Sequence, residues 1–255
     1  MNVVILAAGR GTRLRPLTYY IPKVLLPVCG KPILDYIVET LSASKHVDKV
    51  FIAVSEHIEA ISNYIEHRKY PRRLRLEPIQ ALSWETGGDL RLVIEQANIS
   101  EPFIVCNGDV FSPISLDKFV EFHNKCEKDL GTVASVLLKR VSGEEARRHG
   151  LVDLEGGLVK RFEEKPESYH GKRATVNSGY YVFGKRILDQ RDTYLPAKRS
   201  KLEHTVLTAL ASEGLLAGVI LKTPYWIDVG TFDAYISAQS TLLRYRGYPE
   251  FSEHE

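Results

Sequence analysis

The first residues of the chain combine a buried strand with the side chains of a phosphate-binding site. An apolar run ends at Leu6, and the loop after it holds small residues together with Arg10, Arg13 and Arg15. Amide N–H groups can line an anion site only where small residues let the ligand approach the backbone. Arginines add charge-assisted, often bidentate hydrogen bonds to phosphate oxygens. With Lys23 following, these residues predict a site for a multiply charged phosphate ligand.

Two common phosphate-binding motifs do not fit this loop. The dinucleotide fingerprint requires G-x-G-x-x-G, and Leu14 occupies the position of its third glycine. The P-loop requires G-x-x-x-x-G-K-[ST], whereas Gly30-Lys31 is followed by Pro32 and lacks the upstream glycine. The loop therefore belongs to another class of phosphate site.

The stretch from Leu6 to Val28 resembles the signature of the sugar-1-phosphate nucleotidyltransferases, also called nucleotide-sugar pyrophosphorylases. That signature is L-A-[AG]-G-x-G-T-R-L-x-P-L-T, followed by P-K-x-L-[LV]-P-[VI]. The resemblance implies that Arg13 holds the β- and γ-phosphates of an NTP and that Lys23 neutralises its α-phosphate. A turn that merely joins a strand to a helix would not explain these two cations. The resemblance also implies a set of nucleotide-binding residues in the loop: Leu6, Ala7, Ala8, Gly9, Gly11 and Thr12.

A carboxylate follows a second buried strand, Phe103–Cys106, in an Asn-Gly-Asp turn that ends at Asp109. Ligands of open α/β sheets bind outside the carboxyl ends of the strands, so Asp109 should share a crevice with the loop after Leu6. The resemblance implies that Asp109 and Asp228, in a W-x-D-x-G-T motif, are metal ligands. Mg²⁺ is usually bound by one or two carboxylates plus phosphate oxygens, so Mg²⁺ is the expected cofactor. The alternatives are a turn role for Asp109 and a helix-starting role for Asp228.

Motifs in the second half resemble the sugar side of the family's site. In F-x-E-K-P the lysine contacts the sugar phosphate and the glutamate contacts sugar hydroxyls, which implies these roles for Lys165 and Glu164. An N-[AS]-G-x-Y motif implies sugar-pocket roles for Asn177 and Gly179, and Gly150 matches a glycine that lets the backbone approach the sugar ring. Glu203 fits a family acid before the penultimate helix, and we expect a structural role for it.

The base-recognition loop departs from the family's frequent G-T-A-G-x-L pattern. Here Thr86, Gly87 and Gly88 follow Glu85, and this T-G-G variant resembles some cytidylyl- and guanylyltransferases. Thr86 and the two glycines are the expected nucleotide contacts, because glycines at a helix start let the backbone pack against a flat base. Glu85 has two open interpretations: it accepts hydrogen bonds from guanine or a cytosine amino group, or it faces solvent. The sequence names neither the base nor the sugar.

Periodicity predicts the elements that position these residues. Apolar strand patterns alternate with helical patterns in the first half, and the second half has successive strands with a hairpin at Glu155–Gly157. This predicts an α/β protein, a Rossmann-like three-layer α/β/α sandwich with a mixed, mostly parallel central sheet. Helices are expected to begin at Ser115, within 200–212 and near Thr231, and Thr86–Asp89 has capping-box spacing.

The expected organisation is one catalytic domain over residues 1–245, with a nucleotide half of about 1–130 and a sugar-binding half of about 131–245. Residues 246–255 are expected to form a short C-terminal tail, and the hexapeptide pattern of the β-helix domain found in many relatives is missing. As a whole the chain resembles a stand-alone catalytic domain of the mannose-1-phosphate guanylyltransferases and the glucose-1-phosphate thymidylyl- and cytidylyltransferases.

Composition restricts the partners. The net charge of +2 gives no general field for nucleic acid or a membrane, and no apolar run reaches transmembrane length. Three cysteines without C-x-x-C spacing argue against a disulfide framework or zinc site and fit a cytoplasmic location. The expected partners are an NTP and a sugar 1-phosphate, and the sequence is compatible with a homo-oligomer.

The resemblance thus implies an enzyme that converts an NTP and a sugar 1-phosphate to an NDP-sugar and pyrophosphate with Mg²⁺. Two alternatives belong to other classes. A catalytically silent, regulatory paralogue would bind nucleotide sugar, but such subunits should have lost the charged residues that are present here. A phosphocholine-type cytidylyltransferase would need a cage for a quaternary ammonium, and the sugar-side motifs favour a sugar instead.

Overall fold

The computed structural model describes residues 1–220 and 222–247, so the predicted tail lies outside the described residues from position 248 onward. Short 3₁₀ turns at Thr12–Leu14, Leu17–Tyr19 and Lys23–Leu25 occupy the loop after β1. The elements of the first half are β1 (Asn2–Leu6), β2 (Pro27–Val28), β3 (Lys31–Pro32), α1 (Ile33–Ser42), β4 (Lys49–Val54), α2 (Ile58–Glu66), β5 (Arg75–Gln80), α3 (Glu85–Gln96), β6 (Phe103–Asn107), β7 (Val110–Phe111) and α4 (Leu116–Leu130).

The second half contributes more strands and shorter helices. A π-helical segment, Glu203–Leu207, leads directly into α8. The elements are β8 (Ala134–Ser142), α5 (Gly143–Ala146), β9 (Gly150–Glu155), β10 (Leu158–Glu164), β11 (Arg173–Phe183), α6 (Lys185–Asp189), α7 (Arg191–Tyr194), α8 (Thr208–Ser212), β12 (Leu216–Ile220), β13 (Ile227–Asp228) and α9 (Phe232–Tyr245).

In the described part of the chain, one nine-stranded sheet has the order β5-β4-β1-β6-β11-β8-β12-β10-β9. Strands β5, β4, β1 and β6 are parallel to one another, because each connection between them in the chain carries a crossover helix. In the second half, β11 is antiparallel to both β6 and β8, and β9 and β10 form the expected hairpin. The predicted mixed sheet is thus confirmed, but the expectation that it is mostly parallel is wrong. Among the described strands, four of the eight neighbouring pairs are antiparallel, because β11 and β10 each run opposite to both of their neighbours in the sheet order.

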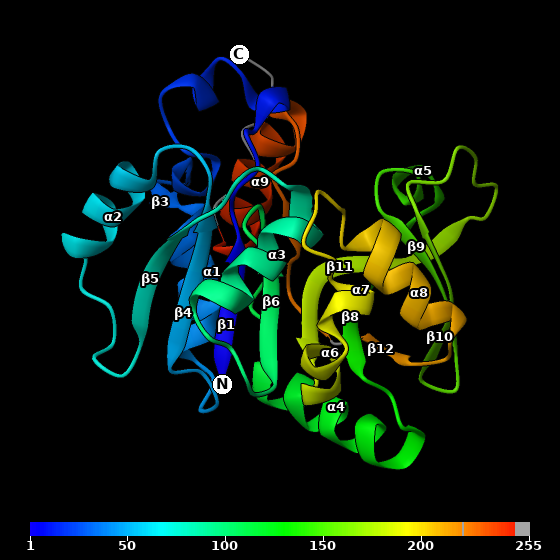
Figure 1. Cartoon of the computed structure of the whole chain (residues 1–255). Coiled ribbons are helices and arrows are strands. Elements are labelled where there is room, and N and C mark those ends of the chain that lie inside the picture. The colour runs from blue at the N-terminus through cyan, green and yellow to red at the C-terminus, as the bar shows by residue number, and fades with distance from the viewer. Residues whose placement is uncertain (221, 248–255) are drawn as a thin grey trace.

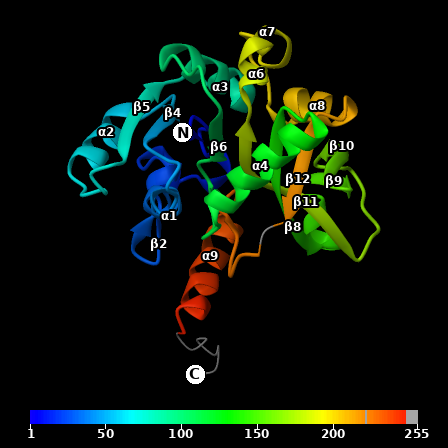
Figure 2. The same cartoon turned by 90° about the horizontal axis from the view of Figure 1, so that it is seen from below.

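Helices cover both faces of the sheet, which confirms the three-layer architecture. Strand residues alternate between the two cores: Val3 and Ile5 pack on the side of α1, α4 and α9, whereas Val4 packs on the side of α3 and α8. Figure 1 shows the sheet between these layers, and Figure 2 shows α3, α6, α7 and α8 on one side with α1 and α9 on the other.

Side-chain caps fix two of the predicted helix starts. Ser115 Oγ accepts a hydrogen bond from the Lys118 amide at the start of α4, and Thr231 Oγ1 accepts one from the Ala234 amide at the start of α9. The predicted capping box at Thr86 is wrong. The helix α3 begins at Glu85, two residues earlier than a Thr86 cap requires, and its Asp89 carboxylate accepts hydrogen bonds from the preceding backbone instead.

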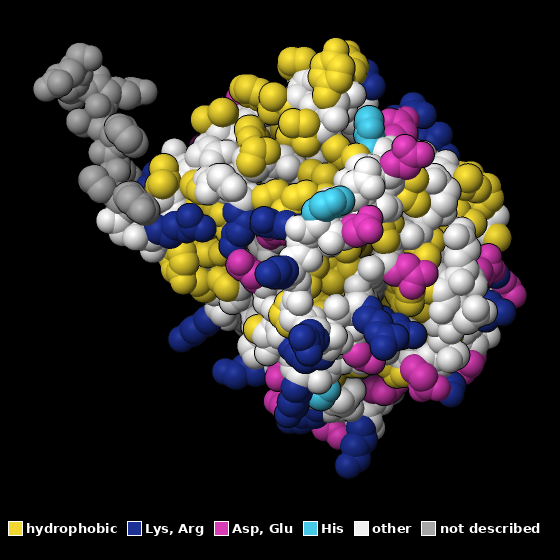
Figure 3. Space-filling model, turned by 90° about the vertical axis from the view of Figure 1, so that its left-hand side faces the viewer, with side chains coloured by type: hydrophobic (Ala, Val, Ile, Leu, Met, Phe, Trp, Pro, Cys, Tyr) yellow, Lys and Arg dark blue, Asp and Glu magenta, His cyan; other side chains and the backbone are white. Residues whose placement is uncertain are grey.

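The surface is mixed in character. On the face that carries α2 and β5, Lys and Arg side chains are interspersed with Asp and Glu, and hydrophobic side chains gather at the upper end (Figure 3). Among the described residues, no helix is both long enough and apolar enough to span a membrane. The three cysteines are free thiols, and Cys106 is fully buried in the core.

Candidate active site

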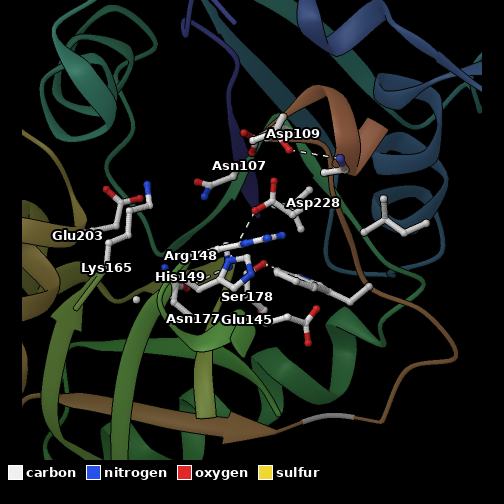
Figure 4. Close-up of a pocket in the computed structure, with 18 of the residues that line it drawn as sticks. Asn107, Asp109, Glu145, Arg148, His149, Lys165, Asn177, Ser178, Glu203 and Asp228 are labelled. Carbon is white, nitrogen blue, oxygen red and sulfur yellow. Dashed lines mark hydrogen bonds and ion pairs between the residues drawn. The ribbon is translucent and has the colours of Figure 1, made fainter. Parts of the chain in front are cut away.

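A cavity of about 900 Å³ lies outside the carboxyl ends of β1 and β6. Figure 4 shows its side chains converging from several separate segments. Predicted site residues that line it are Leu6, Gly9, Arg13, Thr86, Asp109, Gly150, Glu164, Lys165, Asn177, Gly179 and Asp228. Among the described residues, the predicted members outside its lining are Ala7, Ala8, Gly11, Thr12, Lys23, Gly87 and Gly88.

The two predicted metal carboxylates are brought together by the backbone. The strands β7 and β13 pair antiparallel with Asp228 opposite Val110, and the Val229 amide donates to the Asp109 carbonyl at 2.9 Å. Asp109 therefore enters the cavity from the end of β6, and Asp228 enters from the segment before α9. Residues far apart in the sequence thus meet at one point.

Lys23 neutralises one member of this carboxylate pair. Its Nζ lies 2.5 Å from Asp109 Oδ2, and the lysine side chain is only 15% exposed. Burial works to raise the pKa of Asp109, but the Lys23 ion pair and hydrogen bond outweigh it and hold the pKa below its usual value. Burial and the nearby Asp109 charge raise the pKa of Asp228 to about 6. The single charge of Lys23 therefore does not neutralise both carboxylates of the Asp109–Asp228 pair.

Two unpaired oxygen atoms beside the carboxylate pair fit a metal ion. Asp228 Oδ1 and Asn107 Oδ1 are buried and lack a hydrogen-bond partner within the described structure, although both residues line the cavity. Oxygen atoms of this kind are the ligands that Mg²⁺ prefers. No cluster of three or more His, Cys, Asp or Glu side chains suited to a metal occurs among the described residues, so a metal here would rely on these few oxygens.

A glycine leaves room between Asp228 and the phosphate-loop arginine. A Cβ atom at Gly230 would lie 2.9 Å from Asp228 Oδ1 and 3.6 Å from Arg13 Nη2. Arg13 itself lies on the 3₁₀ turn Thr12–Leu14, which begins after Gly11 in the left-handed region at φ +61°. The arginine and the carboxylate therefore approach the same space from the two ends of the chain.

The β9–β10 hairpin positions the residues that were predicted to bind the sugar phosphate. Gly150 pairs with Glu164, and a Cβ at Gly150 would lie 2.8 Å from Glu164 Oε2. Lys165 adopts φ +48°, with its amide bonded to the His149 carbonyl at 3.2 Å. Left-handed backbone at a non-glycine residue is unusual and often marks a functional position. Lys165 Nζ lies 3.4 Å from Glu164 Oε1.

Asn177 and Gly179 lie where β11 loses its regular pairing with β8. The Asn177 amide donates to the Tyr181 hydroxyl at 2.7 Å, and its carbonyl oxygen accepts from the Gly179 amide at 3.0 Å. The Asn177 side chain therefore stabilises this irregular part of β11 through both of its polar atoms, and Asn177 also lines the cavity.

The T-G-G segment is packed against the protein itself. The amides of Gly87 and Gly88 both donate to the Ser200 carbonyl, at 2.8 and 3.2 Å. A Cβ at Gly88 would lie 2.6 Å from the Lys198 carbonyl oxygen. In this structure the two glycines thus permit close approach of residues 198–200, a role that the sequence did not predict.

The cavity lining next to this segment includes two glutamates. Glu203, for which we expected a structural role, accepts a hydrogen bond from Thr86 Oγ1 at 2.7 Å, and burial raises its pKa. Glu85 Oε1 lies 2.8 Å from Arg199 Nη2, and this ion pair neutralises the charge of the Glu85 carboxylate within the protein. Both glutamates line the cavity.

Sequence reasoning missed a group of lining residues around Trp226. The His149 ring meets the Trp226 ring edge-on at 5.1 Å, and Lys139 Nζ lies 4.9 Å from the centre of the tryptophan ring. His149 Nδ1 is 3.7 Å from Asp228 Oδ2, and burial lowers the pKa of His149. Arg148 also lines this part. Trp226 is the tryptophan of the W-x-D-x-G-T motif, and Arg148 and His149 directly precede Gly150, whereas Lys139 carried no signal in the sequence.

Comparisons with curated proteins agree with these motifs. The mannose-1-phosphate guanylyltransferase catalytic subunit beta of Xenopus tropicalis is 34% identical over 252 residues, covering 96% of this chain and 65% of that protein. Mannose-1-phosphate guanylyltransferase 1 of Arabidopsis thaliana is 31% identical over 249 residues, covering 95% and 65%. The chain thus spans 65% of the length of these relatives.

Solved structures share the fold. HddC from Yersinia pseudotuberculosis, complexed with GMP-PN, matches with a TM-score of 0.74 at 25% identity and covers 94% of this chain and 99% of its own. A UDP-glucose pyrophosphorylase complexed with UDP-glucose matches with a TM-score of 0.77 at 21% identity, covering 96% and 99%, and supports the fold alone. The sequence profile of the family described as Nucleotidyl transferase matches residues 2–244, so the chain belongs to the nucleotidyl transferase family.

Proposed function

We propose that this chain transfers a nucleotidyl group from an NTP to a sugar 1-phosphate, giving an NDP-sugar and pyrophosphate, with residues 1–245 acting as one catalytic domain. The observation that carries the proposal is the meeting of Asp109 and Asp228 in one cavity with cations from both halves of the chain. Arg13 comes from the phosphate loop and Lys165 from the sugar-side hairpin. Two phosphorylated substrates need such a two-sided site.

The reaction requires no protein nucleophile. A phosphate oxygen of the sugar 1-phosphate forms a bond to the α-phosphorus, and the bond from that phosphorus to the α–β bridging oxygen breaks. The bridging oxygen leaves with pyrophosphate and takes the electron pair. Because both reactants are anions, positioning and charge neutralisation supply most of the rate enhancement.

Each cation has a separate role. Arg13 holds the β- and γ-phosphates that leave, and Lys23 neutralises the α-phosphate as the bond changes partners. Lys165 holds the attacking phosphate, and Glu164 accepts hydrogen bonds from sugar hydroxyls. Lys23 lies outside the cavity lining, but its Nζ is paired with Asp109, which lines the cavity, and its side chain is mostly shielded from water, which strengthens its field.

Divalent metal use is general in this family, and we propose Mg²⁺ held by Asp109 and Asp228. The orphaned Asp228 Oδ1 and the raised pKa of Asp228 support a cation between these groups. When bound, such an ion supplies Lewis-acid charge stabilisation to phosphate oxygens. Leu6, Gly9 and Thr86, which line the cavity, are the proposed nucleotide contacts, and Asn177, Gly179 and Gly150 the proposed sugar contacts.

The test is a matrix of the common NTPs against mannose, glucose, N-acetylglucosamine and heptose 1-phosphates, scored by pyrophosphate release with Mg²⁺. The relatives named above make GTP with mannose 1-phosphate the first pair to try. We expect release that depends on both substrates. Binding of a nucleotide sugar without turnover of any pair would instead favour the silent regulatory paralogue, and turnover with phosphocholine would favour the other cytidylyltransferase class.

A further inference from the structure

The sugar half of the cavity contains a cation that the roles above leave unused. Arg148 lines the cavity, and in Figure 4 its side chain extends into it below that of Asp228. Over residues 1–220 and 222–247, its guanidinium has no hydrogen-bond or ion-pair partner. An arginine left without a partner beside a substrate cavity is available to bind an anion.

Backbone hydrogen bonds fix the segment that carries Arg148. The segment lies between α5 and β9, and the Arg148 amide donates to the Glu145 carbonyl at 3.0 Å. The neighbouring His149 amide donates to the Ala146 carbonyl at 3.3 Å. The Glu145 carboxylate accepts hydrogen bonds from the amide and hydroxyl of Ser142 in a capping box, so it is engaged by α5.

Lys165 alone does not balance a sugar phosphate. A phosphate monoester carries about −1.5 to −2 charges at pH 7. Lys165 carries one positive charge, its Nζ lies 3.4 Å from Glu164 Oε1, and the half-buried Glu203 interacts with the same charge. The positive charge of Lys165 is therefore partly neutralised by glutamates before a substrate binds. A second cation is needed to balance the charge of the sugar phosphate.

We propose that Arg148 is the second cation of the sugar-phosphate subsite and binds the phosphate of the sugar 1-phosphate together with Lys165. This inference rests on the proposed function. The planar guanidinium offers two parallel N–H donors, so it binds two phosphate oxygens and leaves the third oriented for attack. Lysine, as a point charge, lacks this orienting geometry.

The expected kinetic signature follows from where the charge moves. Negative charge leaves the attacking phosphate as the new bond forms, so Arg148 stabilises the bound substrate at least as strongly as the transition state. Its loss therefore acts mainly on the KM of the sugar phosphate. A cation that served the leaving pyrophosphate would act on kcat and on the KM of the NTP.

The experiment compares Arg148→Ala, Arg148→Lys and the control Arg147→Ala with wild-type protein, using GTP and mannose 1-phosphate or the best pair of the substrate matrix. Arg147 is exposed on the same loop and is absent from the cavity lining within the described residues. For Arg148→Ala we expect the sugar-phosphate KM to rise about 10- to 100-fold, with the NTP KM within about twofold. The sugar-phosphate KM of Arg148→Lys should lie between those of wild type and Arg148→Ala, and that of Arg147→Ala should match wild type.

An unchanged sugar-phosphate KM in folded Arg148→Ala, or a rise confined to the NTP, would overturn the inference while leaving the proposed function intact. If the wild-type protein turns over no substrate pair, the proposed function fails instead. Thermal stabilisation by mannose 1-phosphate, with mannose as the control, then decides the inference. Stabilisation lost in Arg148→Ala supports the subsite, and stabilisation retained in that variant contradicts it.

Discussion

Gly230→Ala is expected to impair catalysis by displacing one carboxylate. The new Cβ would lie 2.9 Å from Asp228 Oδ1, whereas ordinary contacts begin at about 3.4 Å. The carboxylate must therefore move by about half an ångström in a closely packed site. Because a misplacement of about 1 Å can cost about 100-fold in rate, we expect kcat to fall about tenfold. The overpacking should cost about 1–3 kcal/mol of stability at most.

The assay is steady-state pyrophosphate release, combined with urea unfolding to separate rate from stability. Gly214→Ala is the control, because its Cβ meets nothing within 4 Å but its φ of +70° imposes backbone strain. This variant should lose about 1 kcal/mol of stability and keep its kcat. If Gly230→Ala keeps wild-type kcat, or if Gly214→Ala loses as much kcat as Gly230→Ala, the positioning argument for Asp228 fails.

Three further perturbations test separate parts of the account. Lys23→Ala should lower kcat about 10²- to 10³-fold in pyrophosphate release while the thermal melt stays cooperative, and near wild-type turnover would remove Lys23 from the mechanism. Gly88→Ala should lower the free energy of unfolding by about 1–3 kcal/mol, since its Cβ would lie 2.6 Å from the Lys198 carbonyl oxygen. Equal urea midpoints for Gly88→Ala and wild type would show that residues 198–200 yield easily. Burial lowers the pKa of His123 to about 4. The unfolded chain binds this proton near pH 6.5 and the folded chain does not, so stability is complete above pH 6.5 and falls as the pH drops toward 4. We expect the free energy of unfolding, measured with urea at both pH values, to fall by about 2 kcal/mol between pH 7 and pH 5. This fall should be smaller in His123→Gln.

The sequence predicted those parts of the site that follow from strand ends. Leu6 and Asn107 are paired neighbours at the ends of β1 and β6, so the phosphate loop and Asp109 had to share one edge of the sheet. Apolar periodicity likewise predicted the crossover helices. These features are local, and their patterns extend over enough residues to be recognised.

The rest depends on pairings without a periodic signal. The two-residue strands β7 and β13 bring Asp228 beside Asp109, yet two residues carry no pattern. The contacts of Gly88 with residue 198 and the exposure of Arg148 to the cavity arise from tertiary packing. Neither could be derived from spacing alone, because side-chain direction in a loop is set by the elements around it.

The central claim is direct transfer from NTP to sugar phosphate without a covalent enzyme intermediate. Exchange of radiolabelled pyrophosphate tests it most directly. The account predicts that label enters the NTP when NDP-sugar and Mg²⁺ are present, and that NTP with labelled pyrophosphate alone gives no exchange. Exchange in the absence of any sugar compound would reveal a nucleotidyl-enzyme and contradict the account, as would failure of label to enter the NTP from any NDP-sugar.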